Sequence, residues 1–268
     1  MRLLHGIWDA FEGQAFPELN RDVHGVDPFD VPPEWPRYRT FDWGSGAPLS
    51  VGWWAVDPEG DLYRYREWYG AKKDENTSVW IGLRMSNAEI ARGILERERD
   101  ASGRPEKVKP GPADPSIWSK RRDKKTGAIG IPIAQELAAE GVTFVQANNE
   151  RIHGRQQVHS RLRVDPDPAH PDQPGHPKIY TFNNLEHWWR TMLNLRNDTR
   201  NIEDVDTDQE DHVYDETRYM CMYKPLRPQV AKPSDANTFQ GERRRYIQAK
   251  KLAARMGISL ERAYRMVR

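Results

Sequence analysis

The chain has 268 residues, of which 37% are hydrophobic and 30% charged, with a net charge of +1 and a single cysteine. This length suits one large domain, or a domain with an appendage. One cysteine excludes a disulfide framework and fits a reducing compartment. No apolar run is long enough to span a membrane, and the N-terminus lacks the apolar stretch of a signal peptide. We therefore expect a soluble intracellular protein.

Positive charge is concentrated near the C-terminus. Residues 224–268 contain 12 Lys and Arg against three acidic residues, a net charge of +9, so the preceding residues carry −8. A basic tail on an acidic body favours binding of the tail to a polyanion or to an acidic partner. A solvated basic helix is the alternative. Residues 249–268 also show the helix, glycine turn and helix pattern of a DNA-reading motif.

The N-terminal part predicts an extended segment followed by a meander. Residues 1–36 contain five prolines and are predicted to be an extended lead-in. Strands are predicted at 38–42, 49–56 and 62–69, because apolar and aromatic residues there are separated by Gly-rich and Asp-Pro-Glu-Gly turns. Strands joined by such short turns form an antiparallel meander.

The rest of the chain alternates helices with short strands. Ser86 and Glu89 form a capping box that predicts a helix at 86–99. The segment that ends at Asp114 is predicted as an edge strand, because its prolines cannot donate to a ladder. The other predicted elements are helices at 131–140, 151–164 and 185–195, strands at 142–145 and 178–182, and an irregular loop at 165–177. This alternation is typical of an α/β or mixed α+β domain.

Three acidic sites stand out by their order. Asp42 ends the first strand of the meander, Asp114 lies mid-chain, and Asp211 and Asp215 lie on a late helix. At 100° per residue, the last two side chains point within about 40° of each other. Metal-dependent nucleases of the RNase H-like group use acids in this order. Cleavage of a phosphodiester uses two divalent ions about 3.5–4 Å apart, and hard cations such as Mg²⁺ bind carboxylate oxygens.

Each of these residues also has a structural interpretation. Asp42 suits a turn former before a Gly-rich loop, and Asp114 suits a helix N-cap followed by proline. The acids of the late helix lie opposite its apolar stripe, so they are expected to face solvent, with Asp215 paired to Arg218. His212 either reaches the same cleft as Asp215 or is an ordinary hydrogen-bonded residue.

Several other chemistries lose support. The sequence has no Gly-x-x-x-x-Gly-Lys-Ser/Thr phosphate loop and no Cys-x-x-Cys pair for zinc. It also lacks a Gly-x-Ser-x-Gly elbow and a Gly-x-Gly-x-x-Gly turn after a strand. ATP hydrolysis, serine chemistry and dinucleotide redox chemistry are therefore not indicated.

Six segments form a combined pattern. They are Leu-Leu-His-Gly-Ile-Trp-Asp with Phe-Glu-Gly at 3–13, Val-Asp-Pro-Phe at 26–29, Pro-Arg-Tyr-Arg-Thr-Phe-Asp-Trp-Gly at 36–44, Ala-Asp-Pro-Ser at 113–116, Ala-Asn-Asn-Glu-Arg at 147–151 with Gly154, and the Asp-His-x-x-Asp helix followed by Arg-Tyr at 218–219. Together they resemble the C-terminal nuclease half of tailed-phage terminase large subunits. The resemblance covers about residues 1–223.

The resemblance implies a fold and a set of site residues. The fold would be RNase H-like, a mixed sheet with an antiparallel meander followed by parallel strands and flanked by helices. Two Mg²⁺ or Mn²⁺ ions would be bound by three acids, with Asp215 favoured over Asp211 as the third. The implied catalytic residues are Asp42, Asp114, Asp215 and His212, the implied metal ligands are Asp42, Asp114, Asp215 and Asp211, and the candidate phosphate contacts are Arg151 and Arg155.

The resemblance also implies a role and partners. The activity would be an endonuclease that cuts concatemeric double-stranded DNA with little sequence specificity, in the host cell cytoplasm and without a membrane. Its partners would be double-stranded DNA, the portal protein, the terminase small subunit and the ATPase domain of the same terminase, which these residues lack. The domains would be a lead-in at 1–36, a nuclease at 37–223 and a basic tail at 224–268.

Three alternatives remain open at this point. A resolvase or transposase would share the acids but prefer branched DNA or transposon ends. A non-catalytic domain that docks on the portal or on DNA would keep the fold and ignore metal. A regulator would use the C-terminal helix–turn–helix pattern.

Overall fold

The computed structural model describes residues 13–100, 102–120, 129–165 and 175–224, with a few isolated positions between 246 and 260. One compact unit comprises residues 1–165 and 175–226 and contains every named helix and strand. The second unit comprises 166–174 and 227–268. The predicted DNA-reading pattern and most of the basic tail therefore lie outside the described residues.

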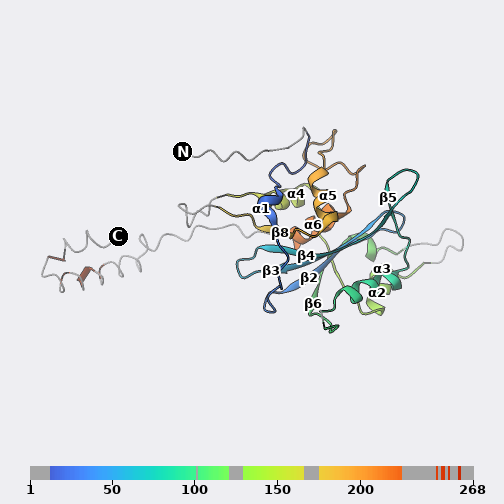
Figure 1. Ribbon diagram of the computed structural model, residues 1–268, viewed down its shortest axis with the longest axis horizontal. Helices are drawn as coiled ribbons and strands as arrows, with labels where there is room; N and C mark the ends of the chain where they lie inside the picture. Colours follow the sequence, from blue (N-terminus) through green and yellow to red (C-terminus); the bar gives the residue numbers. More distant parts are fainter. Residues whose placement is uncertain are drawn as a thin grey trace. The chain divides into compact units, whose positions relative to one another are not determined.

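A single mixed sheet organises the first unit (Figure 1). Its order is β1-β8-β4-β3-β2-β6-β7, with β5 paired to β4. The strands β2, β3 and β4 form the predicted antiparallel meander, and the β2–β6, β6–β7, β4–β8 and β1–β8 pairs are parallel. The strands are β1 Gly25–Val26, β2 Arg37–Asp42, β3 Leu49–Val56, β4 Leu62–Lys73, β5 Trp80–Gly82, β6 Val108–Ala113, β7 Val145–Gln146 and β8 Ile179–Phe182. This arrangement confirms the predicted fold class.

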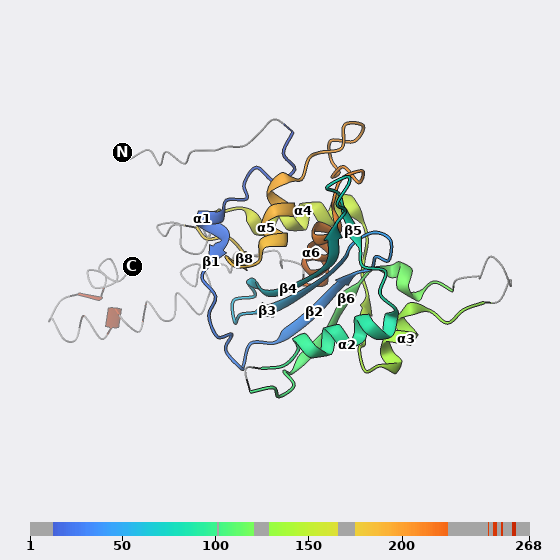
Figure 2. The same ribbon diagram turned by 45° about the vertical axis from the view of Figure 1, so that its right-hand side comes forward.

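Helices cover both faces of the sheet. Figure 2 shows α2 and α3 on one face, with α4, α5 and α6 on the other. The helices are α1 Arg21–His24, α2 Asn87–Arg97, α3 Ile133–Ala139, α4 Arg151–Leu162, α5 Glu186–Asn194 and α6 His212–Tyr223, with a 3₁₀ turn at Pro115–Trp118. The capping box predicted from Ser86 and Glu89 begins α2.

Two hydrophobic cores follow from the alternation of side chains along each strand. On β3, Trp53 packs into the core under α2 and α3, whereas Trp54 packs into the core under α4, α5 and α6. Both tryptophans are fully buried. On β2, Phe41 belongs to the first core and Tyr38 to the second. Even-numbered residues of β2 therefore point towards α6.

The N-terminal segment differs from the predicted extended lead-in. Ala15, Phe16 and Leu19 are buried in the core beside α4 and α6, and β1 pairs with β8. The ring of Phe16 lies 5.5 Å from that of Tyr214. The prolines predicted an extended chain. However, Ala15, Phe16 and Leu19, which precede most of these prolines, pack beside α4 and α6.

The strand β6 is not simply an edge. It lies between β2 and β7, contrary to the prediction. However, β7 pairs only with Pro112 and Ala113, so among the described residues the rest of β6 has one ladder neighbour, β2. A register shift in β2 between Arg39 and Phe41 accompanies this proline-containing strand. The prolines thus fall where few ladder bonds are required.

A buried ion pair attaches α6 to the sheet. The Glu216 carboxylate on α6 pairs with the Arg64 guanidinium on β4, and both side chains are fully buried. Trp54 Nε1 donates to Glu216 Oε1 at 2.7 Å. A Cβ on Gly52 would collide with both charged groups, so the glycine leaves room for the pair above β3.

Replacement of Glu216 by Gln should destabilise the fold. Arg64 would then lose its nearer counter-ion and keep only the Glu67 carboxylate, 3.8 Å from Nη2, so the loss should approach the roughly 3–5 kcal/mol of a broken buried pair. Urea unfolding followed by tryptophan fluorescence would measure the loss. Glu203→Gln, on an exposed loop, is the matched control and should stay within about 0.5 kcal/mol of the unchanged protein. Equal midpoints for the two variants would contradict this role of the pair.

Candidate functional site

The end of β2 meets the start of α6. Asp42 is the last residue of β2 and is only 6% exposed. It shares the α6 face with Thr40, whose hydroxyl accepts a hydrogen bond from Trp54. His212 Nδ1, from the first turn of α6, lies 2.9 Å from Asp42 Oδ2. Two residues separated by 170 positions, both predicted as catalytic, are therefore in direct contact.

The charge state of Asp42 reflects its burial. The pKa of Asp42 is raised to about 7, mainly by burial and then by the negative charges of Asp215 and Asp114, while the contact with His212 opposes the increase. Burial alone would lower the pKa of His212, but the bond to Asp42 and the nearby carboxylates leave it raised. Because such interactions require proximity, the acids from all three predicted sites share one region.

Asp114 follows β6 and lies beside the end of β2. Its backbone N–H donates to the Phe41 carbonyl oxygen at 2.9 Å, which holds Asp114 next to Asp42 across the parallel pair. Its Oδ1 accepts a hydrogen bond from the Ser116 N–H at 2.9 Å, and its Oδ2 accepts one from the Ser116 hydroxyl. The predicted N-cap is confirmed, and the same residue faces the acid cluster.

The late helix carries two acids in different surroundings. Asp215 Oδ1 accepts hydrogen bonds from Arg218 Nη2 at 2.9 Å and Nε at 3.1 Å, so the predicted pairing is confirmed. Asp211 precedes the helix, is 9% exposed and has a pKa raised to about 7, mainly by burial and then by Asp215. The expectation that both acids face solvent was wrong: Asp211 is buried, and only 16% of the Asp215 side chain is accessible, because α6 begins against the body of the protein.

Arg151 lies among the acids of the late segment. Its Nε donates to Asp204 Oδ2 at 2.7 Å, and its Nη1 lies 3.5 Å from Asp215 Oδ1. Its Nη2 is 4.0 Å from Asp211 Oδ2. Arg151 therefore partly compensates the charge of these three acids.

Arg155 has a structural role. The side chain is 7% exposed, and its guanidinium donates to the carbonyl oxygens of Ala15, Ile202 and Asp204. These bonds join α4 to the N-terminal segment and to the loop before α6. The predicted phosphate contact of Arg155 does not fit this arrangement, because a ligand would have to displace several protein acceptors.

Two neighbours of the acids were not predicted as site residues. The phenol of Tyr219 has a pKa raised above its ordinary value by burial and then by Asp42, Asp215 and Asp114. Asp204 holds Arg151, as described above. Tyr219 lies one turn after Asp215, so helical spacing could have indicated it. Asp204 belongs to a loop, where no periodic signal exists.

The comparisons with known proteins point to one fold. No protein-family model matches the sequence, and no curated protein matches it either. The large terminase of a thermophilic bacteriophage superposes with a TM-score of 0.55 at 18% identity, over 77% of this chain and 44% of that one. The P22 large terminase nuclease domain superposes with a TM-score of 0.54 at 14% identity, over 79% of this chain and 92% of that domain. The chain has the fold of a terminase nuclease domain.

This terminase-like fold agrees with the resemblance predicted from the sequence segments. At these identities the likeness establishes the architecture. The chain spans less than half the length of the thermophilic-phage terminase and nearly the whole P22 nuclease domain. No helix in the described ranges is long and apolar enough to cross a bilayer.

The donor set suits a hard divalent cation. Asp42, Asp114 and Asp215 offer carboxylate oxygens, the ligands that Mg²⁺ and Mn²⁺ prefer. Among the described residues, no three His, Cys, Asp or Glu side chains are close enough to hold a metal ion as they stand. The Asp42 carboxylate contacts His212, and the Asp215 carboxylate is paired with Arg218. A bound cation would offset both the burial of the Asp42 charge and the repulsion from Asp215 and Asp114, which together raise the pKa of Asp42.

Asp42→Asn should stabilise the metal-free protein at about pH 8. The folded-state pKa of Asp42 is about 7 against an ordinary 3.8, so the stability of the folded state falls as pH rises through this window. The raised pKa of His212 gives the same pH dependence, because its stabilising proton is lost at high pH. Since the Asp42 carboxylate is the main cause of that increase, Asp42→Asn removes this contribution and the gain is reduced by it. Asparagine removes the buried charge and keeps the volume.

Thermal unfolding in EDTA measures the effect. We expect a gain of at least about 1 kcal/mol at pH 8, equivalent to roughly 2–4 °C in Tm, and a smaller gain near pH 5. Asp208→Asn, on an exposed loop, is the control. A lower Tm for Asp42→Asn at pH 8 would show that the carboxylate is stabilised without metal.

Proposed function

We propose that the chain is a metal-dependent DNA endonuclease of the phage terminase type. The observation that carries the proposal is the convergence of Asp42, Asp114 and Asp215 at one end of the sheet in a terminase-like fold. These acids come from a strand end, the start of a 3₁₀ turn and the last named helix. A packing role alone would not require three mutually repelling carboxylates, one of them buried with a pKa near 7.

The three acids would hold two Mg²⁺ or Mn²⁺ ions. When bound, such ions lower the pKa of a coordinated water and neutralise the charge on the leaving oxygen. The contacts of Asp215 with Arg218 and Arg151 all use Oδ1, which leaves Oδ2 available. His212 orients Asp42 through one carboxylate oxygen, as partners of metal ligands commonly do.

The substrate would be concatemeric double-stranded DNA. Arg151 is partly exposed, with 27% of its side chain accessible, and is the better placed of the two predicted phosphate contacts. Contacts to phosphate position DNA without reading its sequence, so cleavage would be nearly sequence-independent. The portal, the terminase small subunit and an ATPase domain would be the partners in packaging, in the host cytoplasm.

A plasmid-nicking assay tests the proposal. The protein should nick supercoiled DNA with Mn²⁺ or Mg²⁺ and not with EDTA. Loss of a residue that only orients a ligand costs about 10–100-fold, so Asp42→Asn should lower the rate by more than about 100-fold. Asp208→Asn should cut at the unchanged rate. Metal-independent nicking, or full activity of Asp42→Asn, would exclude this mechanism.

Asp215→Asn should abolish nicking, whereas Asp211→Asn should retain a larger share of the activity. Asp215 is one of the charges that raise the pKa of Asp42, whereas the charge of Asp211 acts on His212. Both variants should be compared at equal protein concentration with Mn²⁺, after thermal melts have shown that they fold. The reverse order of activities would make Asp211 the third ligand.

The same assays separate the alternatives. A docking domain would bind DNA or a portal protein without nicking in either metal. A resolvase or transposase-like enzyme would prefer a four-way junction or a transposon end over linear duplex. We expect linear duplex and junction substrates to be cut at comparable rates.

A further inference from the structure

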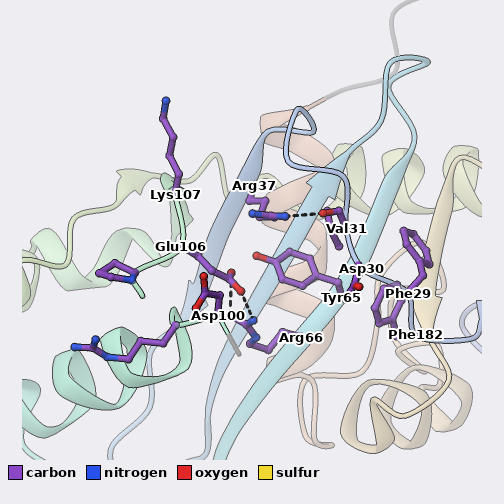
Figure 3. Close-up of a pocket in the computed structure, with 12 residues that line it drawn as sticks. Phe29, Asp30, Val31, Arg37, Tyr65, Arg66, Asp100, Glu106, Lys107 and Phe182 are labelled. Carbon is purple, nitrogen blue, oxygen red and sulfur yellow. Dashed lines mark hydrogen bonds and ion pairs between the residues drawn. The ribbon is translucent and has the colours of Figure 1, made fainter. Parts of the chain in front are cut away.

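A cavity of about 540 Å³ lies away from the acids. It is bounded by β2, by β4, by the segment that follows α2 and by residues 29–31 (Figure 3). Arg37, in its wall, begins β2, whereas Asp42 ends it. Five residues of extended chain span about 17 Å, and the two side chains point to opposite faces of the sheet. The cavity is therefore separate from the proposed nuclease site.

The two ends of the cavity differ in chemistry. Phe29 and Phe182 form one end, with ring centroids 5.0 Å apart, and Phe29 is 39% exposed. Lys107 lies at the other end, and Arg37 and Tyr65 lie between them (Figure 3). A ligand in this space would meet aromatic rings on one side and hydrogen-bond donors on the other.

Two donors in the wall have no partner within the described residues. The Tyr65 hydroxyl and Arg37 Nε are both shielded from solvent and make no hydrogen bond. Arg37 Nη2 donates to the Val31 carbonyl oxygen at 2.7 Å, which fixes the guanidinium in place. Buried donors without partners are rare in folded proteins. Two unpaired donors in the wall of one cavity, on strands β2 and β4, are suited to an oxygen-bearing ligand.

Most of the acids in the wall are already engaged. Glu106 accepts hydrogen bonds from Arg66 at 3.2 and 2.7 Å. Asp100 accepts hydrogen bonds from Ser102 and Arg104 within its own loop. Asp30 is an exposed acid among the lining residues. Arg37 therefore offers its positive charge to a ligand, whereas the exposed Lys107 side chain extends away from the cavity (Figure 3) and adds attraction from a distance. This charge favours an anion.

We propose that this cavity binds a small organic anion in which a phosphate or carboxylate is attached to a flat apolar ring. The anionic oxygens accept hydrogen bonds from the Tyr65 hydroxyl and from Arg37, and Lys107 adds long-range attraction. The ring packs against Phe29 and Phe182. The volume falls within the roughly 300–1,000 Å³ of ordinary small-molecule sites. This binding does not depend on nuclease activity.

Calorimetric titration of the full chain with phenyl phosphate tests the proposal, with inorganic phosphate and phenol as the two halves of the probe. Phenyl phosphate should bind saturably and at least about 10-fold more tightly than either half, because both ends of the cavity are used. Tyr65→Phe removes only the hydroxyl and should weaken binding by about 3–10-fold. Lys107→Gln should weaken binding and flatten its dependence on salt.

Tyr63→Phe is the matched control, since Tyr63 lies on the same strand outside the lining. This variant should bind phenyl phosphate with unchanged affinity. Tyr65→Phe should also keep the wild-type Tm, because its hydroxyl has no partner to lose. Three results would overturn the proposal. They are no saturable binding up to about 10 mM phenyl phosphate, equal affinity of Tyr65→Phe and the unchanged protein, or a clear fall in the Tm of Tyr65→Phe, which would reveal an internal partner.

Discussion

The buried pair between Glu216 and Arg64 is the constraint on which the site depends. It joins α6 to β4 with no exposed surface on either side chain, and Trp54 adds a hydrogen bond from β3. Because Glu216 follows Asp215 directly, the same interaction that holds the helix also sets the position of the proposed third ligand. His212, one turn earlier, is then placed against Asp42. The buried ion pair between α6 and β4 thus fixes the positions of His212 and Asp215 relative to Asp42.

A second interface balances the charge of the site. Gly154 lets α4 approach α6, since a Cβ at this position would lie 2.6 Å from Arg218 Cγ. Arg218 and Arg151 then reach Asp215 from two directions. These cations partly compensate the acids when no divalent ion is bound, although the pKa of Asp42 stays near 7. In the proposed nuclease, bound metal would relieve this cluster, a compromise between stability and activity that is common at catalytic sites.

Side-chain alternation explains why the two faces of β2 carry different groups. Alternation of side chains sends Asp42 to the α6 face and Arg37 to the other. At the Asp42 end, carboxylates gather and α6 supplies their partners. At the Arg37 end, donors gather around a cavity whose acids are mostly paired. One strand thus presents an acidic site at its C-terminal end and a basic one at its N-terminal end, about 17 Å apart along the chain.

Local rules determined much of this protein from its sequence alone. The capping box at Ser86, the N-cap at Asp114, the meander and the pairing of Asp215 with Arg218 depend on neighbours a few residues apart, so the sequence predicted them. Tertiary packing decided the rest. The burial of Asp211, the structural role of Arg155 and the place of Phe16 in the core depend on elements that are distant in the chain. No local pattern encodes those contacts, because their free energy arises only when α4, α6 and the N-terminal segment pack together.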